Sequence, residues 1–253
     1  MLSTFPAPAP RDVTQLRVAT YNIHKGVQGI GPGRRLEIFN LRQAVAHLDA
    51  DLVCLQEVRG FHHRLAKRWA NWPPEDQAQT LSPQDFHSVY RSNAVTKHGE
   101  HGNALLSRWP VSHVGHTDVS DHPLEQRGLL HAVVHTPWGE LHVVVVHLGL
   151  SGGTRWRQVQ RLGQFLAREV PADARLLVAG DFNDWRGRLH VPMAELGLHT
   201  WPHKMLTFPA RFPVWPLDRI YGRGLQARAA WVPARGGWSR WSDHLPLVLD
   251  WGP

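Results

Sequence analysis

Two apolar, β-branched segments, residues 128–135 and 140–147, are separated only by the four letters TPWG. Strands joined by so short a turn pair antiparallel, because a parallel connection needs a crossover of a dozen or more residues. This hairpin is the strongest constraint on the fold, since it disfavours a doubly wound parallel sheet. It requires at least one sheet with antiparallel pairing.

Many other short segments are predicted to be strands, because they alternate or run apolar over typical strand lengths. They are residues 16–23, 51–56, 87–95, 103–107, 175–179, 217–221, 225–232 and 245–250. Residues 38–48 and 154–170 instead repeat apolar side chains at helical spacing. Many strands with few interspersed helices indicate an α/β fold in which two packed sheets carry helices on their outer faces.

The chain of 253 residues is long enough to bury a sizeable core. No linker, low-complexity tract or repeat divides it, so we expect one domain over residues 16–253, preceded by a loose Pro-rich arm over residues 1–15. The single cysteine, Cys54, lies in the apolar segment DLVCLQEV. This position indicates core packing and suits a reducing compartment.

Targeting signals and membrane spans are not evident in the sequence. The first residues, MLSTFPAPAP, lack a basic start followed by an apolar stretch, and nowhere do about 18 apolar residues follow one another. We therefore expect a cytoplasmic protein, and nothing in the sequence requires more than a monomer. The 28 Lys and Arg outnumber the 21 Asp and Glu, for a net charge of +7. This balance favours a polyanionic partner such as nucleic acid or acidic lipid headgroups.

Polar residues gather where the predicted strands begin or end. The segment GDFNDW, residues 180–185, directly follows the apolar run LLVA. The same feature recurs at Asn22, Glu57, His147, Asp218, Asp243 and His244. Taken singly, each fits a turn cap, a surface ion pair or an ordinary histidine. Antiparallel strands can bring such ends to a common rim, so we expect these side chains to share one cleft.

Phosphodiester hydrolysis is the chemistry that such a cleft would suit. A phosphodiester is anionic, so attack by water needs cations and hydrogen-bond donors that offset the developing charge. The hard oxygen ligands of Glu57, Asp243 and Asn22 suit Mg²⁺ or Mn²⁺. No Cys/His cluster at zinc spacing competes with them.

Eight short motifs occur in an order that resembles the endonuclease/exonuclease/phosphatase superfamily, whose fold is that of DNase I. They are TYNIHKG, LQEV, GNALLSRWP, EQRGLL, VVHLGL, GDFND, LDRIY and SDHLP. The chain looks most like a compact bacterial branch, similar to uncharacterised proteins found beside cardiolipin synthase genes in enteric bacteria. The resemblance implies a four-layer α/β/β/α sandwich with two central, mainly antiparallel or mixed sheets and the site at one end of them.

The resemblance also implies roles for particular residues. Asn22 and Glu57 match positions that hold the divalent cation, and Asp243 lies close enough to assist. Asp181, with Asn183, would orient or deprotonate the attacking water and bind the phosphate. His244, held by Asp218, would stabilise the pentacovalent phosphate or donate a proton.

His147 matches a position where the resemblance leaves two readings open. A second imidazole near the leaving oxygen leaves the general acid undecided between His147 and His244. A histidine at this position also argues against a specialised apurinic endonuclease.

The resemblance places Asn103 and Arg127 where relatives support the site or touch phosphate, although a polar turn residue and a solvated charge are the simpler alternatives. The helix that starts SGGTRWRQVQR is expected to expose Arg155, and GDFNDWR adds Arg186. Such basic flanks can track a nucleic-acid backbone, or can be solvated surface only. The aromatic loop LTFPARFPVWP does not discriminate between substrates.

We therefore predict a Mg²⁺- or Mn²⁺-dependent nuclease that hydrolyses DNA, in preference to RNA, to 5′-phosphate and 3′-hydroxyl ends. The alternative is a phospholipid or other small-molecule phosphodiesterase or phosphatase, suggested by the lipid-gene neighbourhood of similar proteins. A non-catalytic binding module is disfavoured, because every expected catalytic position is filled.

Overall fold

Two mixed sheets form the centre of the computed structural model, which describes residues 14–29, 31–233 and 236–252. The predicted arm therefore falls mainly on residues 1–13, which lie outside the described residues. One sheet has six strands in the order β12 (Gln226–Trp231), β13 (Leu247–Gly252), β1 (Leu16–Asn22), β4 (Leu52–Val58), β6 (Gly99–Ser107) and β5 (His87–Thr96). The other has five, in the order β11 (Asp218–Arg223), β10 (Leu176–Asp181), β9 (Gly139–His147), β8 (Gly128–Thr136) and β7 (Val111–Asp118).

The predicted hairpin is present, since β8 and β9 pair antiparallel from Leu130 opposite Val145 to Thr136 opposite Gly139. Each of these two sheets also contains one parallel pair, β1 with β4 and β9 with β10. The remaining neighbours in both sheets are antiparallel. Both sheets are therefore mixed but mainly antiparallel, as predicted.

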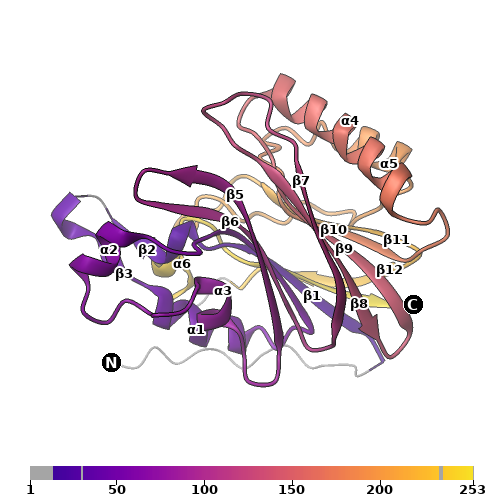
Figure 1. The fold of residues 1–253 in the computed structure, drawn as a ribbon. Helices are drawn as coiled ribbons and strands as arrows, with labels where there is room; N and C mark the ends of the chain where they lie inside the picture. Colours follow the sequence, from indigo (N-terminus) through magenta and orange to yellow (C-terminus); the bar gives the residue numbers. More distant parts are fainter. Residues whose placement is uncertain (1–13, 30, 234–235, 253) are drawn as a thin grey trace.

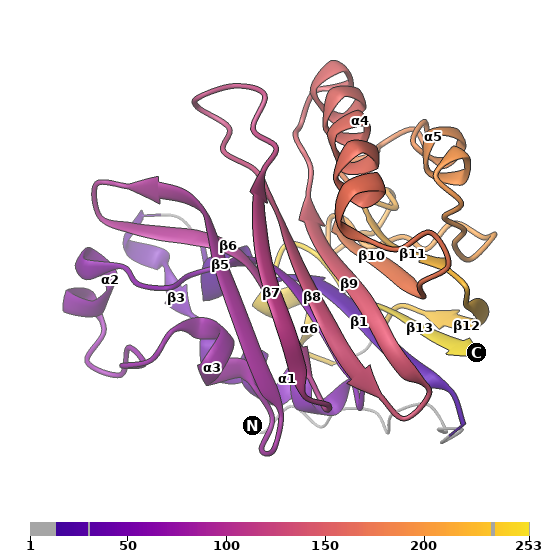
Figure 2. The ribbon, with the colours of Figure 1, turned by 45° about the vertical axis from the view of Figure 1, so that its right-hand side comes forward.

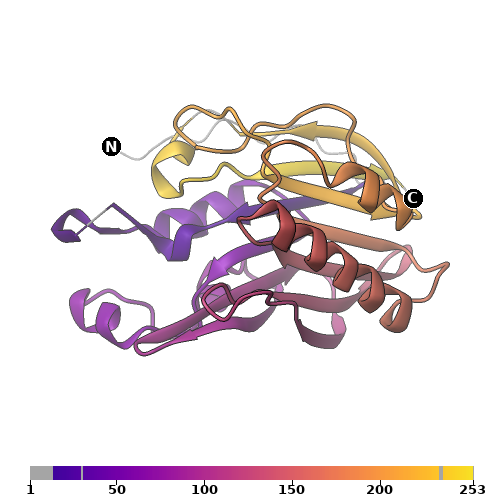
Figure 3. The same cartoon turned by 90° about the horizontal axis from the view of Figure 1, so that it is seen from above.

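Helices cover the outer face of each sheet, which gives the predicted four layers (Figure 1, Figure 2). Leu41 and Val45 of α1 (Ile38–His47) pack with Tyr21 of β1 outside the six-stranded sheet. Leu162 of α4 (Gly152–Glu169) packs with Val144 of β9 outside the five-stranded sheet. α4 and α5 (His190–Glu195) lie side by side in all three views (Figure 3).

A third apolar cluster fills the space between the sheets. Val18, Leu52 and Cys54 of the six-stranded sheet meet Val143 and Leu177 of the five-stranded one. Cys54 is fully buried, as predicted, and burial raises the pKa of its thiol to about 12. Burial on both faces explains why these strands read as nearly continuous apolar runs.

The structure contains elements that the sequence pattern does not reveal. β7 is an edge strand, VSHVGHTD, whose residues are all exposed or only partly buried, and it lacks the apolar alternation typical of a strand with one buried face. The short helices α2 (His63–Arg68), α3 (Gln77–Leu81), α5 and α6 (Trp238–Trp241) and the small sheet of β2 (Val27–Gln28) and β3 (Arg35–Leu36) were also not predicted. Within the described residues, no helix combines the length and apolarity needed to cross a membrane.

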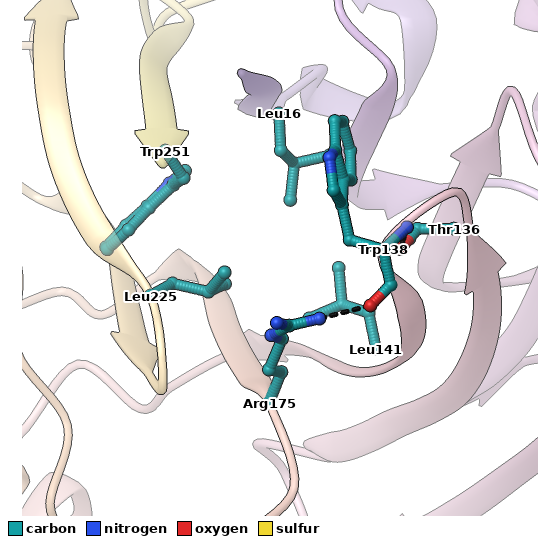
Figure 4. Close-up of a pocket in the computed structure, with 7 residues that line it drawn as sticks. All are labelled: Leu16, Thr136, Trp138, Leu141, Arg175, Leu225 and Trp251. Atoms are coloured by element: carbon teal, nitrogen blue, oxygen red, sulfur yellow. Dashed lines mark hydrogen bonds between the residues drawn. The ribbon is translucent and has the colours of Figure 1, made fainter. Parts of the chain in front are cut away.

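One small cavity lies between the sheets at the end where β1 begins (Figure 4). Leu16, Leu141, Leu225 and Trp251 line it, and the Arg175 guanidinium donates a hydrogen bond to the carbonyl oxygen of Trp138 at its edge. Its volume of about 10 Å³ holds one water molecule at most. It is therefore a packing gap and not a substrate site.

Three histidines meet on the five-stranded sheet beside α4. The His131 Nε2 atom lies 3.0 Å from His142 Nδ1, and the His113 ring centroid lies 5.2 Å from that of His131. Burial lowers the pKa of His131 from 6.5 to about 4, His142 and His113 act in the same direction, and Glu169 opposes them. As the pH falls, His131 is therefore protonated in the unfolded chain before it is protonated in the folded protein. The stability present above pH 6.5 is lost as the pH falls towards 4.

We expect the low pKa of His131 to make the free energy of unfolding fall by roughly 2 to 3 kcal/mol as the pH is lowered from about 7 to 4.5, at ~1.4 kcal/mol per pKa unit. His131→Gln removes the titrating group and should flatten the decline, as measured by urea unfolding across this range. His203→Gln, at an exposed loop position, is the matched control. An unchanged pH slope in His131→Gln would show that acid acts elsewhere.

Candidate active site

Strand register brings the predicted polar residues to one end of the sheets. Asn22 ends β1 opposite Gln56 of β4, next to Glu57. In the other sheet, Asp181 ends β10 opposite both His147 of β9 and Asp218 of β11. The parallel pairs explain the arrangement, because parallel neighbours present their carboxyl ends at the same edge.

Close backbone approach puts Asp181 beside His147. Gly180 has a φ of 155°, and a Cβ there would lie 1.8 Å from the carbonyl oxygen of Val146 on β9. Only glycine fits at this crossing, which explains the Gly that precedes Asp181 in the motif GDFND. Gly180→Ala should therefore separate the two strand ends and misplace the Asp181 carboxylate.

The Asp181 carboxylate is the centre of the site and joins the two sheets. Its Oδ2 accepts a hydrogen bond from Asn22 Nδ2 at 3.2 Å, and its Oδ1 accepts one from the backbone N–H of Asn183 at 2.9 Å. Two imidazoles flank it, with Nε2 of His147 and of His244 at 3.5 and 3.6 Å from Oδ2. The carboxylate, both imidazoles and the Asn22 amide therefore converge as predicted.

Asp218 holds His244 in one orientation. Its Oδ2 lies 2.8 Å from His244 Nδ1 and accepts a second hydrogen bond from the Thr207 hydroxyl at 2.6 Å. Since Asp218 is fully buried, this contact fixes the proton on Nδ1 and aims Nε2 at Asp181. Asp218 and His244 form the predicted His-Asp dyad, and Thr207 supports it.

The two histidines have opposite electrostatic environments. Burial alone would lower the pKa of His244, but the Asp218 and Asp181 carboxylates raise it to about 10. Burial and the positive charge of Arg127 hold the pKa of His147 well below its ordinary value, against the attraction of Glu57. His244 is therefore cationic and His147 neutral at pH 7.

Asp181 itself is an unusually weak acid for a protein aspartate. Complete burial raises the pKa of its carboxyl to about 7, with Asp218 acting in the same direction and His244 opposing both. A carboxylate with a pKa near neutrality is well suited to accept a proton from water.

Glu57 and Asp243 each lie against a basic side chain from the segment that follows Asn22. Lys25 Nζ lies 2.7 Å from Glu57 Oε2, and His24 Nδ1 lies 3.1 Å from Asp243 Oδ2. Burial opposes ionisation of both acids, yet Lys25 lowers the pKa of Glu57 and the hydrogen bond from His24 lowers that of Asp243. Both acids are therefore ionised.

The predicted ligands fit a hard divalent cation by their chemistry. Glu57, Asp243 and Asn22 offer carboxylate and amide oxygens, and Glu57 already has the positive charge of Lys25 beside it. Within the described residues, no three His, Cys, Asp or Glu side chains converge into a ready-made metal cluster. Because Lys25 Nζ contacts Glu57 Oε2, a cation that binds this oxygen would compete with the Lys25 ammonium.

Lys25→Met is expected to tighten Mn²⁺ binding roughly 5-fold, because a partly exposed ion pair worth about 1 kcal/mol no longer has to break. Isothermal titration calorimetry measures this without turnover. The same variant in EDTA should melt at a lower temperature, since Glu57 then lacks its counter-ion. Lys97→Met, at an exposed position in the β5–β6 turn, is the control. Equal or weaker Mn²⁺ binding would contradict the competition.

The four residues predicted to contact the substrate have different surroundings in the structure. Asn103 is fully buried, and its Nδ2 donates to the carbonyl oxygens of Gly128 and Val145, which ties the two sheets together. Arg127 lies near the site, with its Nε donating to Leu148 O at 3.3 Å. Arg186 is exposed beyond Asn183. Their contacts with substrate stay predictions.

Arg155 requires a correction, because it is buried and not exposed as predicted. It is 9% exposed, and its guanidinium donates to the carbonyl oxygens of Gly149 and Leu150 at 3.2 and 2.6 Å. The start of α4 packs over the loop after His147, where these carbonyls need donors. Its neighbours Arg157 and Arg161 are also engaged, by Asp121 and by the carbonyl oxygens of Val119 and Ser120.

Sequence reasoning missed the roles of Lys25, His24 and Thr207. The two basic residues His24 and Lys25, shortly after the predicted metal ligand Asn22, were a usable signal for the first two. Thr207 gave none, because it lies 11 residues from Asp218 in a loop. Asp184 caps the turn after Asn183, accepting from the backbone N–H groups of Arg188 and Leu189, so it stays outside the catalytic set.

The sequence profile of the Endonuclease/Exonuclease/phosphatase family matches residues 19–244, which span the whole site. The chain belongs to this family. Membership supports a metal-dependent phosphoesterase or nuclease-like activity, without fixing the substrate.

Known proteins and solved structures are similar to this chain over most of its length. The uncharacterised protein YbhP of Escherichia coli (strain K12) is 39% identical over 247 residues, covering 92% of this chain and 95% of YbhP. A functionally unknown conserved protein from Enterococcus faecalis V583 has a TM-score of 0.71 at 21% identity, over 94% of this chain and 99% of its own. D. rerio TDP2, solved with a single-strand DNA product, has a TM-score of 0.62 at 16% identity, over 95% and 100% of the two chains.

Proposed function

We propose that the protein is a Mg²⁺- or Mn²⁺-dependent phosphodiesterase that hydrolyses DNA to 5′-phosphate and 3′-hydroxyl ends. The observation that carries this proposal is the Asp181 carboxylate between a neutral and a cationic imidazole, His147 and His244. Such a set provides a proton acceptor and a positively charged donor within one pocket, which phosphodiester hydrolysis needs.

Each side chain has a distinct part in the proposed reaction. Asp181 accepts a proton from the attacking water, and Asn183 holds its carboxylate through the backbone N–H. The His244 imidazolium offsets negative charge on the pentacovalent phosphate and supplies a proton to the leaving 3′-oxygen. Asp218 fixes the orientation of the His244 ring and supports its charge.

Glu57, Asn22 and Asp243 would hold the divalent cation. When bound, this cation would polarise the phosphoryl group and offset part of its negative charge. The chain's own contribution is to keep Glu57 and Asp243 ionised and to place the Asn22 side chain between the cation site and Asp181.

Three observations support DNA as the substrate: the net charge of +7, the exposed Arg186 beyond Asn183, and the likeness in fold to D. rerio TDP2, solved with single-strand DNA. We include Asn103, Arg127, Arg155 and Arg186 as residues that position the substrate, directly or through the loops they hold. We also propose that the protein is monomeric and cytoplasmic, and that residues 16–253 form a single domain.

The proposal is tested by incubating purified protein with labelled single-stranded and duplex DNA, RNA and phospholipid vesicles, each with Mg²⁺, Mn²⁺ or EDTA. DNA cleavage that EDTA abolishes is expected. Products should be ligated without prior phosphorylation and extended by a polymerase, which identifies the 5′-phosphate and 3′-hydroxyl. Release of phospholipid headgroups with all nucleic acids intact would replace the nuclease by a lipid phosphodiesterase.

That second function has one observation in its favour. The loop of residues 206–216 exposes Phe212 and Val214, 79% and 54% exposed, and its Phe208 ring lies 4.8 Å from that of His244. Exposed apolar side chains beside a catalytic residue can enter a membrane interface. The vesicle arm of the experiment decides between the two.

A further inference from the structure

A cavity of about 450 Å³ opens beside Asp243, next to the proposed reaction centre. Three segments far apart in the sequence form it: residues 28, 29, 33 and 35, the loop of residues 209–212 and the segment of residues 239–243. Its walls include Arg35, Arg211 and Arg240, and we call it the arginine groove. It is not part of the Asp181 and His244 constellation.

The arginine groove carries positive charge that the described residues do not neutralise. Arg35 pairs with Glu37 at 3.0 Å, so its charge is partly balanced. Arg211 and Arg240 are both exposed, and neither guanidinium has a hydrogen bond or ion pair with another described residue. This contrasts with Arg155, Arg157 and Arg161 of α4, whose guanidinium groups are engaged within the fold.

The groove is connected rigidly to the active site. The backbone N–H of Ala210 donates to the carbonyl oxygen of Asp243 at 2.7 Å, and the Ser242 hydroxyl donates to that of Asn22 at 2.6 Å. Both Asp243 and Ser242 line the groove. The groove therefore begins at Asp243, one residue from His244, so a ligand that extends from the reaction centre past Asp243 would enter it.

The exposed ring of Phe212 at the edge of the arginine groove indicates that the ligand also contains an aromatic base. Phe212 lines the groove and is 79% exposed, beside the unpartnered Arg211. An exposed aromatic face next to guanidinium groups is a typical platform for a base and its phosphate in single-stranded nucleic acid. A phospholipid with a single phosphodiester would have it at the reaction centre and would bring no second phosphate to Arg211 and Arg240.

We propose that the arginine groove binds a backbone phosphate adjacent to the cleaved bond of a single-stranded nucleic acid, with Phe212 stacked on a base. This inference rests on the proposed phosphodiesterase activity and names its substrate as a polynucleotide of more than one phosphate. Arg211 and Arg240 hold the neighbouring phosphate and do not take part in bond cleavage.

The test compares a polynucleotide with a substrate that has a single phosphate, bis(p-nitrophenyl) phosphate. In Arg211→Gln/Arg240→Gln, kcat/KM for a fluorescent single-stranded DNA hexamer should fall about 10-fold or more, through KM. The rate on bis(p-nitrophenyl) phosphate should not change. The salt dependence of hexamer binding should weaken by about 0.7 in log–log slope for each phosphate that the variant no longer binds. Arg228→Gln, exposed on β12 at the opposite end of the sheet, is the control.

Three results would overturn the inference: equal losses on both substrates, no loss on the hexamer, or loss of binding to anionic vesicles alone. The last would assign the groove to a membrane surface. Hexamer binding in EDTA, followed by fluorescence anisotropy, separates this inference from the proposed function. If no phosphodiester is cleaved, a weaker hexamer affinity in the double variant still supports the groove, and an equal affinity rejects it.

Discussion

Replacing Asp181 by Asn is expected to lower kcat/KM for phosphodiester hydrolysis by about 10³-fold or more, because an amide cannot accept the proton of the attacking water. The same change should stabilise the metal-free protein at pH 8. Burial raises the pKa of this carboxyl from 3.8 to about 7, so its ionised form opposes folding as the pH rises through that range. A neutral amide of the same shape avoids this cost.

Two measurements on the same preparation check this prediction: steady-state hydrolysis of bis(p-nitrophenyl) phosphate with Mn²⁺, and thermal unfolding in EDTA at pH 5 and pH 8. Asp173→Asn, at an exposed position before β10, is the control and should change neither. A variant that keeps more than a tenth of the activity would remove Asp181 from its role. A variant that is inactive and also less stable at pH 8 would indicate loss of structure.

The placement of the site could be predicted because it depends on strand ends. Apolar runs such as LLVA before Asp181 and VVVV before His147 indicate buried strands, and a polar residue that follows such a run lies at the end of the strand. What could not be predicted is the register that sets Asp181 opposite both His147 and Asp218. Register depends on packing between sheets, which no single segment encodes.

The sequence could not predict which of the two histidines is cationic, for a related reason. His147 and His244 both stand beside predicted strands, so the general acid stayed undecided. Both rings lie about equally close to Asp181, but their pKa values diverge because His147 is buried with Arg127 nearby whereas His244 contacts the Asp218 carboxylate. These neighbours come from other strands and become visible only in three dimensions.

Arg155 shows where a periodic pattern gives the wrong answer. Helical spacing correctly placed Val159, Leu162 and Leu166 inward, and it put Arg155 on the opposite, solvated side. The first turn of α4, however, sits over the carbonyls of the loop at Gly149 and Leu150. Unsatisfied buried carbonyls are costly, so a long guanidinium there is buried as a donor. Patterns of apolar residues carry no signal for such a contact.

Asp218→Asn is expected to lower kcat/KM by roughly 10²- to 10⁴-fold while leaving the fold intact, the range typical of a lost proton donor or of a misoriented imidazole. The carboxylate accepts a hydrogen bond from His244 Nδ1–H at 2.8 Å, and its charge has the largest effect of those that raise the pKa of His244. An amide can donate to Nδ1 instead, which moves the imidazole proton to Nε2 and lowers the pKa of His244. The ¹⁵N chemical shifts of the imidazole, measured without metal, report both changes.

Thr207→Val provides a graded comparison for this prediction. Its hydroxyl donates to the same Asp218 oxygen at 2.6 Å but does not touch His244, so its loss should weaken the dyad without inverting the tautomer. We expect a fall in kcat of about 10-fold or less, in keeping with the loss of one hydrogen bond to a charged group, and His244 ¹⁵N shifts close to those of the parent. If Asp218→Asn keeps the parent shifts and rate, His244 is not held by Asp218, and the cationic donor must be sought in His147.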